Sequence, residues 1–103
     1  GGVMFPRFEA ATGVCEIGCW TEPAGSGHGL VTAAARLLVD YAFRERGMQR
    51  IEWITSPANT RSSGVAQRLG MTLDGVLRSS FPYNGERHDS QVWSILASEW
   101  ERP

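Results

Sequence analysis

Lysine is absent from this sequence of 103 residues, so all ten basic side chains are arginines. Eleven acidic residues oppose them and leave a formal net charge of -1. This balance gives no basic field of the kind that binds nucleic acid or an anionic membrane. The lack of lysine also excludes a P-loop, whose Gly-Lys-Ser/Thr signature needs an ammonium group near the outer phosphates of a nucleotide.

Cysteine is scarce, with Cys15 and Cys19 the only two in the chain. On one strand they would share a face about 13 Å apart, beyond the reach of a disulfide. We therefore expect reduced thiols. His28 and His88 stand far apart in the sequence, and two cysteines without a histidine cluster predict no metal site.

Long apolar runs are also lacking, because no stretch approaches the roughly eighteen residues that a membrane helix needs. The first residues, Gly1 to Met4, carry neither the charged nor the apolar region of a signal peptide. We expect a cytoplasmic protein. The length predicts one domain at most, and the hydrophobic content of 42% is typical of globular proteins.

Five extended runs read as strands: residues 3–8, 14–20, 50–55, 72–83 and 87–96. A short segment ending in Gly13 joins the first two as a hairpin, and Ser56-Pro57 ends the third. Asn84-Gly85, between the last two, is a strong hairpin signal. Four large apolar side chains on these runs are expected in the core rather than stacked on a ligand: Trp53, Leu77, Phe81 and Trp93.

Two segments have helical periodicity. In residues 30–46 the expected buried face is Leu30, Ala34, Leu37, Leu38 and Tyr41. Arg36 and Asp40 are spaced to pair on another face, and Gly47 ends the helix. A second helix opens near Asn59, buries Val65, Ala66 and Leu69, and ends at Gly70. The predicted order of elements is ββαβαββ.

A glycine-dense loop, residues 23–29, leads directly into the first helix. The first turn of a helix leaves about four N–H groups without internal partners, and closely spaced glycines let the backbone approach a ligand. The junction therefore predicts a site for phosphate or pyrophosphate, although a plain flexible loop has the same composition. A dinucleotide-binding fingerprint starting at Gly25 does not fit, since its third glycine would fall on Leu30.

Five motifs occur together in one order: residues 15–20 (CEIGCW), 27–32 (GHGLVT), 59–62 (NTRS), 68–71 (RLGM) and 75–78 (GVLR). From about Val14 to Trp100, this set resembles the GNAT acyltransferase superfamily, most closely the RimJ/RimL-like branch that acetylates ribosomal-protein N-termini. The resemblance implies an α+β fold with a mixed, mostly antiparallel central sheet and two helices. It also implies that the chain is the C-terminal portion of such a domain.

The resemblance further implies an acetyl-CoA site. The pyrophosphate of coenzyme A would rest on the loop and first helical turn, at Ser26, Gly27, His28, Gly29, Leu30 and Val31. The pantetheine arm would lie along the preceding strand, at Ile17, Cys19 and Trp20. Asn59 and Ser62 would face the pantetheine amides and the sulfur, and Asn59 can cap its helix at the same time.

The implied chemistry is direct attack of a primary amine on the thioester. Glu16 is the candidate base, although it has the alternative role of a solvent-facing strand residue. A backbone N–H near Cys19, freed by a bulge, would meet the oxyanion. Ser62 would return a proton to the thiolate, with Tyr83 as a second candidate, and no cysteine is expected to act as a nucleophile.

Two classes of function stay open. The first is an acyl-CoA-dependent N-acyltransferase acting on a protein N-terminus or a small amine, and the second is a module that binds coenzyme A or another nucleotide without turnover. Members of the superfamily begin with a strand and helices. This sequence starts at Gly1, after the point at which those elements would stand, so we expect it to lack them. A sheet with such an exposed edge predicts a homodimer or a swapped assembly.

Overall fold

The computed structural model describes residues 2–20 and 28–100. Nine elements follow one another: β1 (Gly2–Glu9), β2 (Val14–Trp20), α1 (His28–Asp40), the π-helical segment η1 (Tyr41–Glu45), β3 (Arg50–Thr55), α2 (Thr60–Arg68), β4 (Thr72–Tyr83), β5 (Glu86–Leu96) and α3 (Ala97–Trp100). The predicted order ββαβαββ is confirmed. The π-helical segment and the short α3 are additions that the sequence pattern did not indicate.

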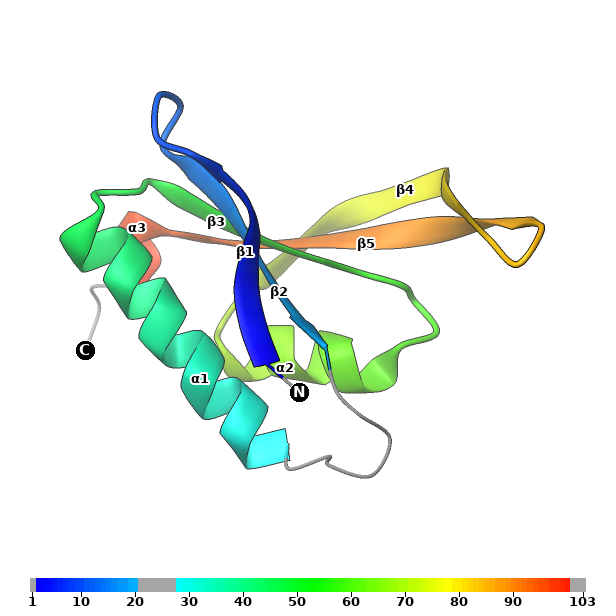
Figure 1. Ribbon diagram of the computed structural model, residues 1–103, viewed down its shortest axis with the longest axis horizontal. Coiled ribbons are helices and arrows are strands. Elements are labelled where there is room, and N and C mark those ends of the chain that lie inside the picture. The colour runs from blue at the N-terminus through cyan, green and yellow to red at the C-terminus, as the bar shows by residue number, and fades with distance from the viewer. Residues whose placement is uncertain (1, 21–27, 101–103) are drawn as a thin grey trace.

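The five strands form one sheet in the order β1-β2-β3-β5-β4 (Figure 1). Three of the four neighbouring pairs are antiparallel, and only β2 and β3 run parallel. The predicted mixed, mostly antiparallel sheet is therefore correct. The β4–β5 hairpin turns at Asn84 and Gly85, whose φ angles of 53° and 76° are those of the tight turn that this dipeptide favours.

One core lies between the sheet and the two longer helices. Alternate strand residues point into it, as in β3, where Ile51, Trp53 and Thr55 are buried and their neighbours are half-buried. The helices share this core through one cluster of buried side chains, which includes Ala35 and Val39 of α1 and Val65 and Ala66 of α2. Helices α1 and α2 therefore cover the same face of the sheet, and the opposite face carries the polar side chains considered below.

The buried face of the first helix differs from the predicted one. Leu37 is 73% exposed and Tyr41 is 41% exposed, whereas the buried apolar residues are Ala35, Val39, Ala42 and Phe43. Alanines let the helix approach the sheet closely, and the wider π turn places Ala42 and Phe43 inward. Of the predicted face, Leu38 packs against the core, while the side chain of Leu30 lies outside the described residues.

The predicted Arg36–Asp40 pair is also wrong. Asp40 accepts from Arg44 Nε at 2.5 Å, one turn further along the helix. Arg36 Nη2 instead donates to the carbonyl oxygen of Arg68 at 2.7 Å and so links α1 to the end of α2. This bond satisfies one of the carbonyl groups that a helix C-terminus leaves without an internal partner.

The second helix follows its prediction closely. Asn59 caps it, Val65, Ala66 and Leu69 are buried, and Gly70 follows with φ 82°. Among the core predictions, Trp53 and Trp93 are buried, but Leu77 is 53% exposed and Phe81 is only half-buried. The outer half of the β4–β5 hairpin extends beyond the helices (Figure 1) and therefore has no helix to cover it. In the described part of the chain no helix is both long and apolar enough to cross a membrane.

Candidate functional site

The parallel strands β2 and β3 pair over only three residues each. Their register runs from Val14 with Arg50 to Glu16 with Glu52. Beyond Glu16, residues 18–20 of β2 pair with β1 on the other flank, and Ile17 lies at the register shift of that ladder. Within the described chain, residues 18–20 are therefore paired with β1 alone, and their flank on the β3 side has no ladder partner.

The start of both longer helices lies at this end of the sheet. Because β2 and β3 are parallel, the elements that follow them begin at the same edge. Helix α1 begins at His28, after residues that the structure does not describe, and α2 begins at Thr60, directly after its cap Asn59. Figure 1 shows the end of β2 near α2 and the start of α1. Open α/β sheets bind ligands at the carboxyl ends of their strands.

The predicted phosphate cradle is only partly described. Ser26 and Gly27 lie outside the described residues, as do the side chains of His28 and Leu30. The backbone of residues 28–30 forms the first turn of α1. Val31 is half-buried and packs against the core. The role of this turn in binding pyrophosphate stays a prediction.

Along β2, the predicted contacts with pantetheine must come mainly from the backbone. Ile17 is 1% exposed, and its side chain belongs to the core. The side chains of Cys19 and Trp20 lie outside the described residues. The β1–β2 ladder shifts register between Met4 and Arg7, opposite Ile17 and two residues before Cys19, whereas Cys19 itself keeps its partner Val3. The role of a backbone N–H there in binding the oxyanion stays a prediction.

Asn59 and Ser62 are brought together at the start of α2. The side-chain oxygen of Asn59 accepts from the backbone N–H of Ser62 at 3.1 Å, which is the capping bond expected from the sequence. Ser62 Oγ accepts from the indole Nε1 of Trp53 at 2.9 Å. This bond uses a lone pair of the hydroxyl and leaves its proton for another acceptor.

Glu16 lies half-buried on the sheet face opposite the helices. Burial raises the pKa of its carboxyl; Arg7 acts against this rise, and the nearby charge of Glu52 adds to it. A raised pKa brings a carboxylate closer to the range in which it serves as a general base. The predicted base is thus neither a freely exposed strand residue nor part of the core.

Charged side chains surround Glu16 on this face. Arg7 on β1 binds Glu52 on β3, and Arg50 also donates to Glu52, at 3.1 Å from Nε and 3.0 Å from Nη2. Arg50 Nη2 lies 2.8 Å from the Asp74 carboxylate, which in turn accepts from Ser94 Oγ at 2.7 Å. The network thus crosses the sheet from β1 to β4.

The other candidates are set apart from this site. Tyr83 is 62% exposed at the end of β4 beside the hairpin turn. Its register partner Glu86 lies seven residues before Trp93, which in turn pairs with Trp53 beside Ser62. Seven residues span roughly 24 Å along a strand. Cys15 is a free thiol and fully buried, and burial, with a further contribution from the charge of Glu52, raises its pKa to about 11. A neutral, enclosed thiol is a poor nucleophile.

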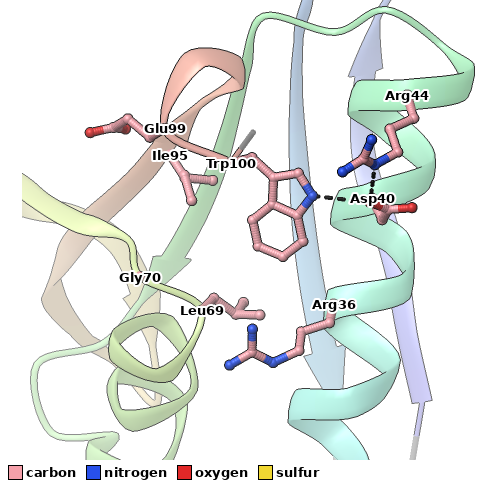
Figure 2. Close-up of a pocket in the computed structure, with 8 residues that line it drawn as sticks. All are labelled: Arg36, Asp40, Arg44, Leu69, Gly70, Ile95, Glu99 and Trp100. Carbon is pink, nitrogen blue, oxygen red and sulfur yellow. Dashed lines mark hydrogen bonds and ion pairs between the residues drawn. The ribbon is translucent and has the colours of Figure 1, made fainter. Parts of the chain in front are cut away.

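A pocket of about 420 Å³ lies between α1, the end of α2 and α3 (Figure 2). Its walls are Arg36, Asp40, Arg44, Leu69, Gly70, Ile95, Glu99 and Trp100. None of these was a predicted site residue. The Trp100 indole donates to Asp40 at 3.1 Å, and Arg44 binds the same carboxylate. Arg36 donates to the carbonyl oxygen of Arg68, and Glu99 accepts from the N–H of Leu96, so these polar groups of the wall are partnered as well.

Three residues that frame the predicted site were not predicted from the sequence as part of it: Arg7, Glu52 and Trp53. The alternation of residues 50–55 placed Glu52 on the face opposite Trp53, but nothing in the sequence indicated which strand would lie beside it. The parallel pairing of β2 with β3 sets Glu52 opposite Glu16. Strand order is a tertiary property, and a pattern within one strand does not contain it.

Comparisons with known proteins agree on one family. A family model described as an acetyltransferase (GNAT) domain matches residues 1–72. The Putative ribosomal N-acetyltransferase YdaF of Bacillus subtilis (strain 168) is 37% identical over 101 residues, covering 98% of this chain and 55% of that protein. Spermidine N(1)-acetyltransferase of Escherichia coli (strain K12) is 31% identical over 78 residues, covering 76% of this chain and 42% of that protein.

Solved structures give the same result. The crystal structure of a probable acetyltransferase matches with a TM-score of 0.91 at 32% identity, covering 95% of this chain and 55% of that one. The chain spans about half the length of the curated relatives named above.

Proposed function

The chain belongs to the GNAT acetyltransferase family, and from that premise we propose that it takes part in acetyl-CoA-dependent transfer of an acetyl group to a primary amine. The family resemblance is confirmed by the match over residues 1–72, which contain four of the five sequence motifs. The donor, the acceptor and the site residues belong to the proposal.

The observation that supports the proposal is that β2 and β3 stop pairing after Glu16 and Glu52. A strand with one unpaired flank offers N–H and C=O groups to an extended ligand, as in strand addition. The pantetheine arm of acetyl-CoA is a chain of amides that suits such a flank. Residues 17–20 would hold it, with the first turn of α1 at the pyrophosphate, where the helix dipole favours negative charge.

Acetyl-CoA, when bound, supplies a thioester that an uncharged amine can attack. The residues of this chain would prepare that attack. Glu16 would take a proton from the acceptor ammonium, because its half-buried position raises the pKa of the carboxyl. Ser62 would provide a proton to the departing thiolate, since its hydroxyl hydrogen is not used in the bond from Trp53.

The acceptor is proposed as a primary amine of either of two kinds. The relatives include a protein named for ribosomal N-acetylation and one named for spermidine. Both acceptors present an ammonium group at neutral pH, so both need the base that Glu16 would supply. The alternative function, binding of coenzyme A without turnover, would use the same flank of β2 and needs neither Glu16 nor Ser62 as a proton carrier.

Two measurements test this proposal. Calorimetric titration with acetyl-CoA should show saturable binding. If no binding is detected, both proposed functions, the enzyme and the binding module, are ruled out. Release of free coenzyme A thiol, followed with spermidine and with a peptide bearing a free N-terminus, then separates turnover from binding. Binding with neither acceptor consumed would favour the non-catalytic module.

We also propose a homodimer or swapped assembly in solution. Strands β1 and β4 are the edges of the described sheet, and exposed edge strands can pair with another chain. Sedimentation equilibrium at micromolar concentration should give a mass of about two chains by this association. A monomer mass would reject it.

A further inference from the structure

Arg7 and Glu16 are direct partners across the β1–β2 ladder. Opposite charges facing each other in this position normally attract and pair. Here the Arg7 guanidinium turns to two other carboxylates, Glu52 on β3 and Glu9 on its own strand, the latter at 3.2 Å from Nε. Among the described residues, the Glu16 carboxylate has no hydrogen bond or ion pair.

Glu52 is the reason that Arg7 is drawn away. Its side chain is only 14% exposed and binds guanidinium groups from two directions, Arg7 on one side and Arg50 on the other. Arg50 is held in turn by Asp74, at 2.8 Å. Because a partly buried carboxylate binds a guanidinium more strongly than an exposed one does, Glu52 competes well for Arg7.

We propose that Glu52 is a positioning residue for Glu16: by engaging Arg7, it keeps that guanidinium from binding Glu16 and leaves the Glu16 carboxylate to accept the proton of the acceptor ammonium. This inference rests on the proposed function for the role of Glu16 as the base. The transfer itself converts the ammonium to a neutral amine and the Glu16 carboxylate to a carboxylic acid.

The effect of losing Glu52 follows from the charges that face Glu16. The charges that act on it directly are Arg7 from β1 and Glu52 from β3. Glu9, Arg50 and Asp74 are joined to these two through ion pairs rather than to Glu16 itself. Removing the charge of Glu52 ends its repulsion of the Glu16 carboxylate and releases Arg7 to bind that carboxylate. Both changes lower the pKa of Glu16 and make it a weaker base.

The test is a titration of Glu16 by NMR, using ¹³C-labelled glutamate and the side-chain carboxyl shift. The midpoint of Glu16 is expected to move to lower pH in Glu52→Gln. The matched control is Glu9→Gln, which removes the exposed partner of Arg7 and leaves the Arg7–Glu52 pair in place. The control should titrate like the original protein. An unchanged midpoint in a folded Glu52→Gln variant overturns the inference.

Two further variants use the same readout. In Arg7→Gln the Glu16 midpoint is expected to rise, because Arg7 no longer favours the carboxylate. In the double variant Arg7→Gln/Glu52→Gln, the Glu16 midpoint should lie at higher pH than in Glu52→Gln alone, since the Arg7 guanidinium is no longer there to bind Glu16. If Glu52→Gln does not fold, Glu52→Asp decides the question, because its shorter side chain loosens the hold on Arg7. A Glu16 midpoint that does not fall in folded Glu52→Asp then overturns the inference.

The pH dependence of kcat/KM gives a second readout. In Glu52→Gln, its acid limb is expected to move to lower pH together with the carboxyl midpoint, while the maximum falls. A merely structural role for Glu52 would lower stability and leave the acid limb in place. Absence of turnover in the original protein would reject the proposed enzyme, whereas the carboxyl titration needs no turnover and tests the charge arrangement separately.

Discussion

The indole Nε1 of Trp53 donates a hydrogen bond of 2.9 Å to Ser62 Oγ. Trp53 is a core residue of β3, and Ser62 lies in the first turn of α2. This one bond ties the helix to the sheet at the place where the family resemblance puts a proton donor. Ser62 therefore has a structural role, whatever its part in the chemistry.

Replacing Ser62 by alanine should destabilise the fold. The buried indole N–H would lose its partner, which costs about 1–3 kcal/mol. Urea unfolding measures the change in the free energy of unfolding. Ser63→Ala is the matched control, because Ser63 Oγ bonds only backbone carbonyl oxygens of its own helix turn, and it should cost clearly less. Equal losses in the two variants would show that the Trp53–Ser62 bond adds nothing to stability.

Asn59 combines a cap with a proposed contact to pantetheine, and two substitutions separate these roles. Asn59→Ala should cost about 1 kcal/mol of stability, since the Ser62 N–H loses its cap. Asn59→Asp keeps a capping oxygen and should retain stability, but it replaces the amide NH₂ that would face the cofactor. Calorimetry should then show weaker acetyl-CoA binding in Asn59→Asp. Undiminished binding would remove Asn59 from the cofactor site.

Glu16→Gln should lower turnover by roughly 10²- to 10⁴-fold, the usual contribution of a general base. Thiol-release kinetics over a range of pH measure this loss, which should be accompanied by loss of the acid limb of the profile. Calorimetry with acetyl-CoA is the control, since the substitution should leave cofactor binding intact. Full activity with an unchanged profile would show that another group, or water, takes the proton.

The same residue predicts a pH dependence of stability. Folding raises the pKa of Glu16, chiefly by burial, so the folded state binds this proton more tightly than the unfolded state does. Its stabilising contribution is full below the unfolded pKa and is lost as the pH rises through the folded pKa. Melting temperatures of Glu16→Gln and the original protein should therefore diverge in favour of the variant over that range. A constant difference would contradict the raised pKa.

The Cys15 thiol should not react with alkylating reagents in the folded protein. Its thiol is fully buried, and its pKa is raised to about 11 by burial and, to a smaller extent, by Glu52. In a Cys19→Ser background, iodoacetamide at pH 8 should alkylate Cys15 only after unfolding in denaturant. Mass spectrometry measures the extent of labelling. Rapid labelling without denaturant would show that this part of the core opens readily.

Much of the fold was available from local patterns. The strands, the Asn84-Gly85 turn, the cap at Asn59 and the glycine after the second helix follow from residue types at fixed spacings, because caps and turns depend on a few adjacent residues. The buried face of the first helix could not be predicted from such local patterns. Its alanines and leucines give several faces of similar apolarity, and contact with the sheet chose Ala35 and Val39 over Leu37.

The candidate site divides in the same way. The sequence by itself determined the family, the glycine loop before α1 and the presence of Glu16 on a strand, since ordered motifs are properties of the chain. Only the tertiary structure set Glu52 beside Glu16 and turned Arg7 from one to the other. Charges that are 36 or 45 positions apart in the chain meet through the order of strands in the sheet, which depends on how the whole core packs.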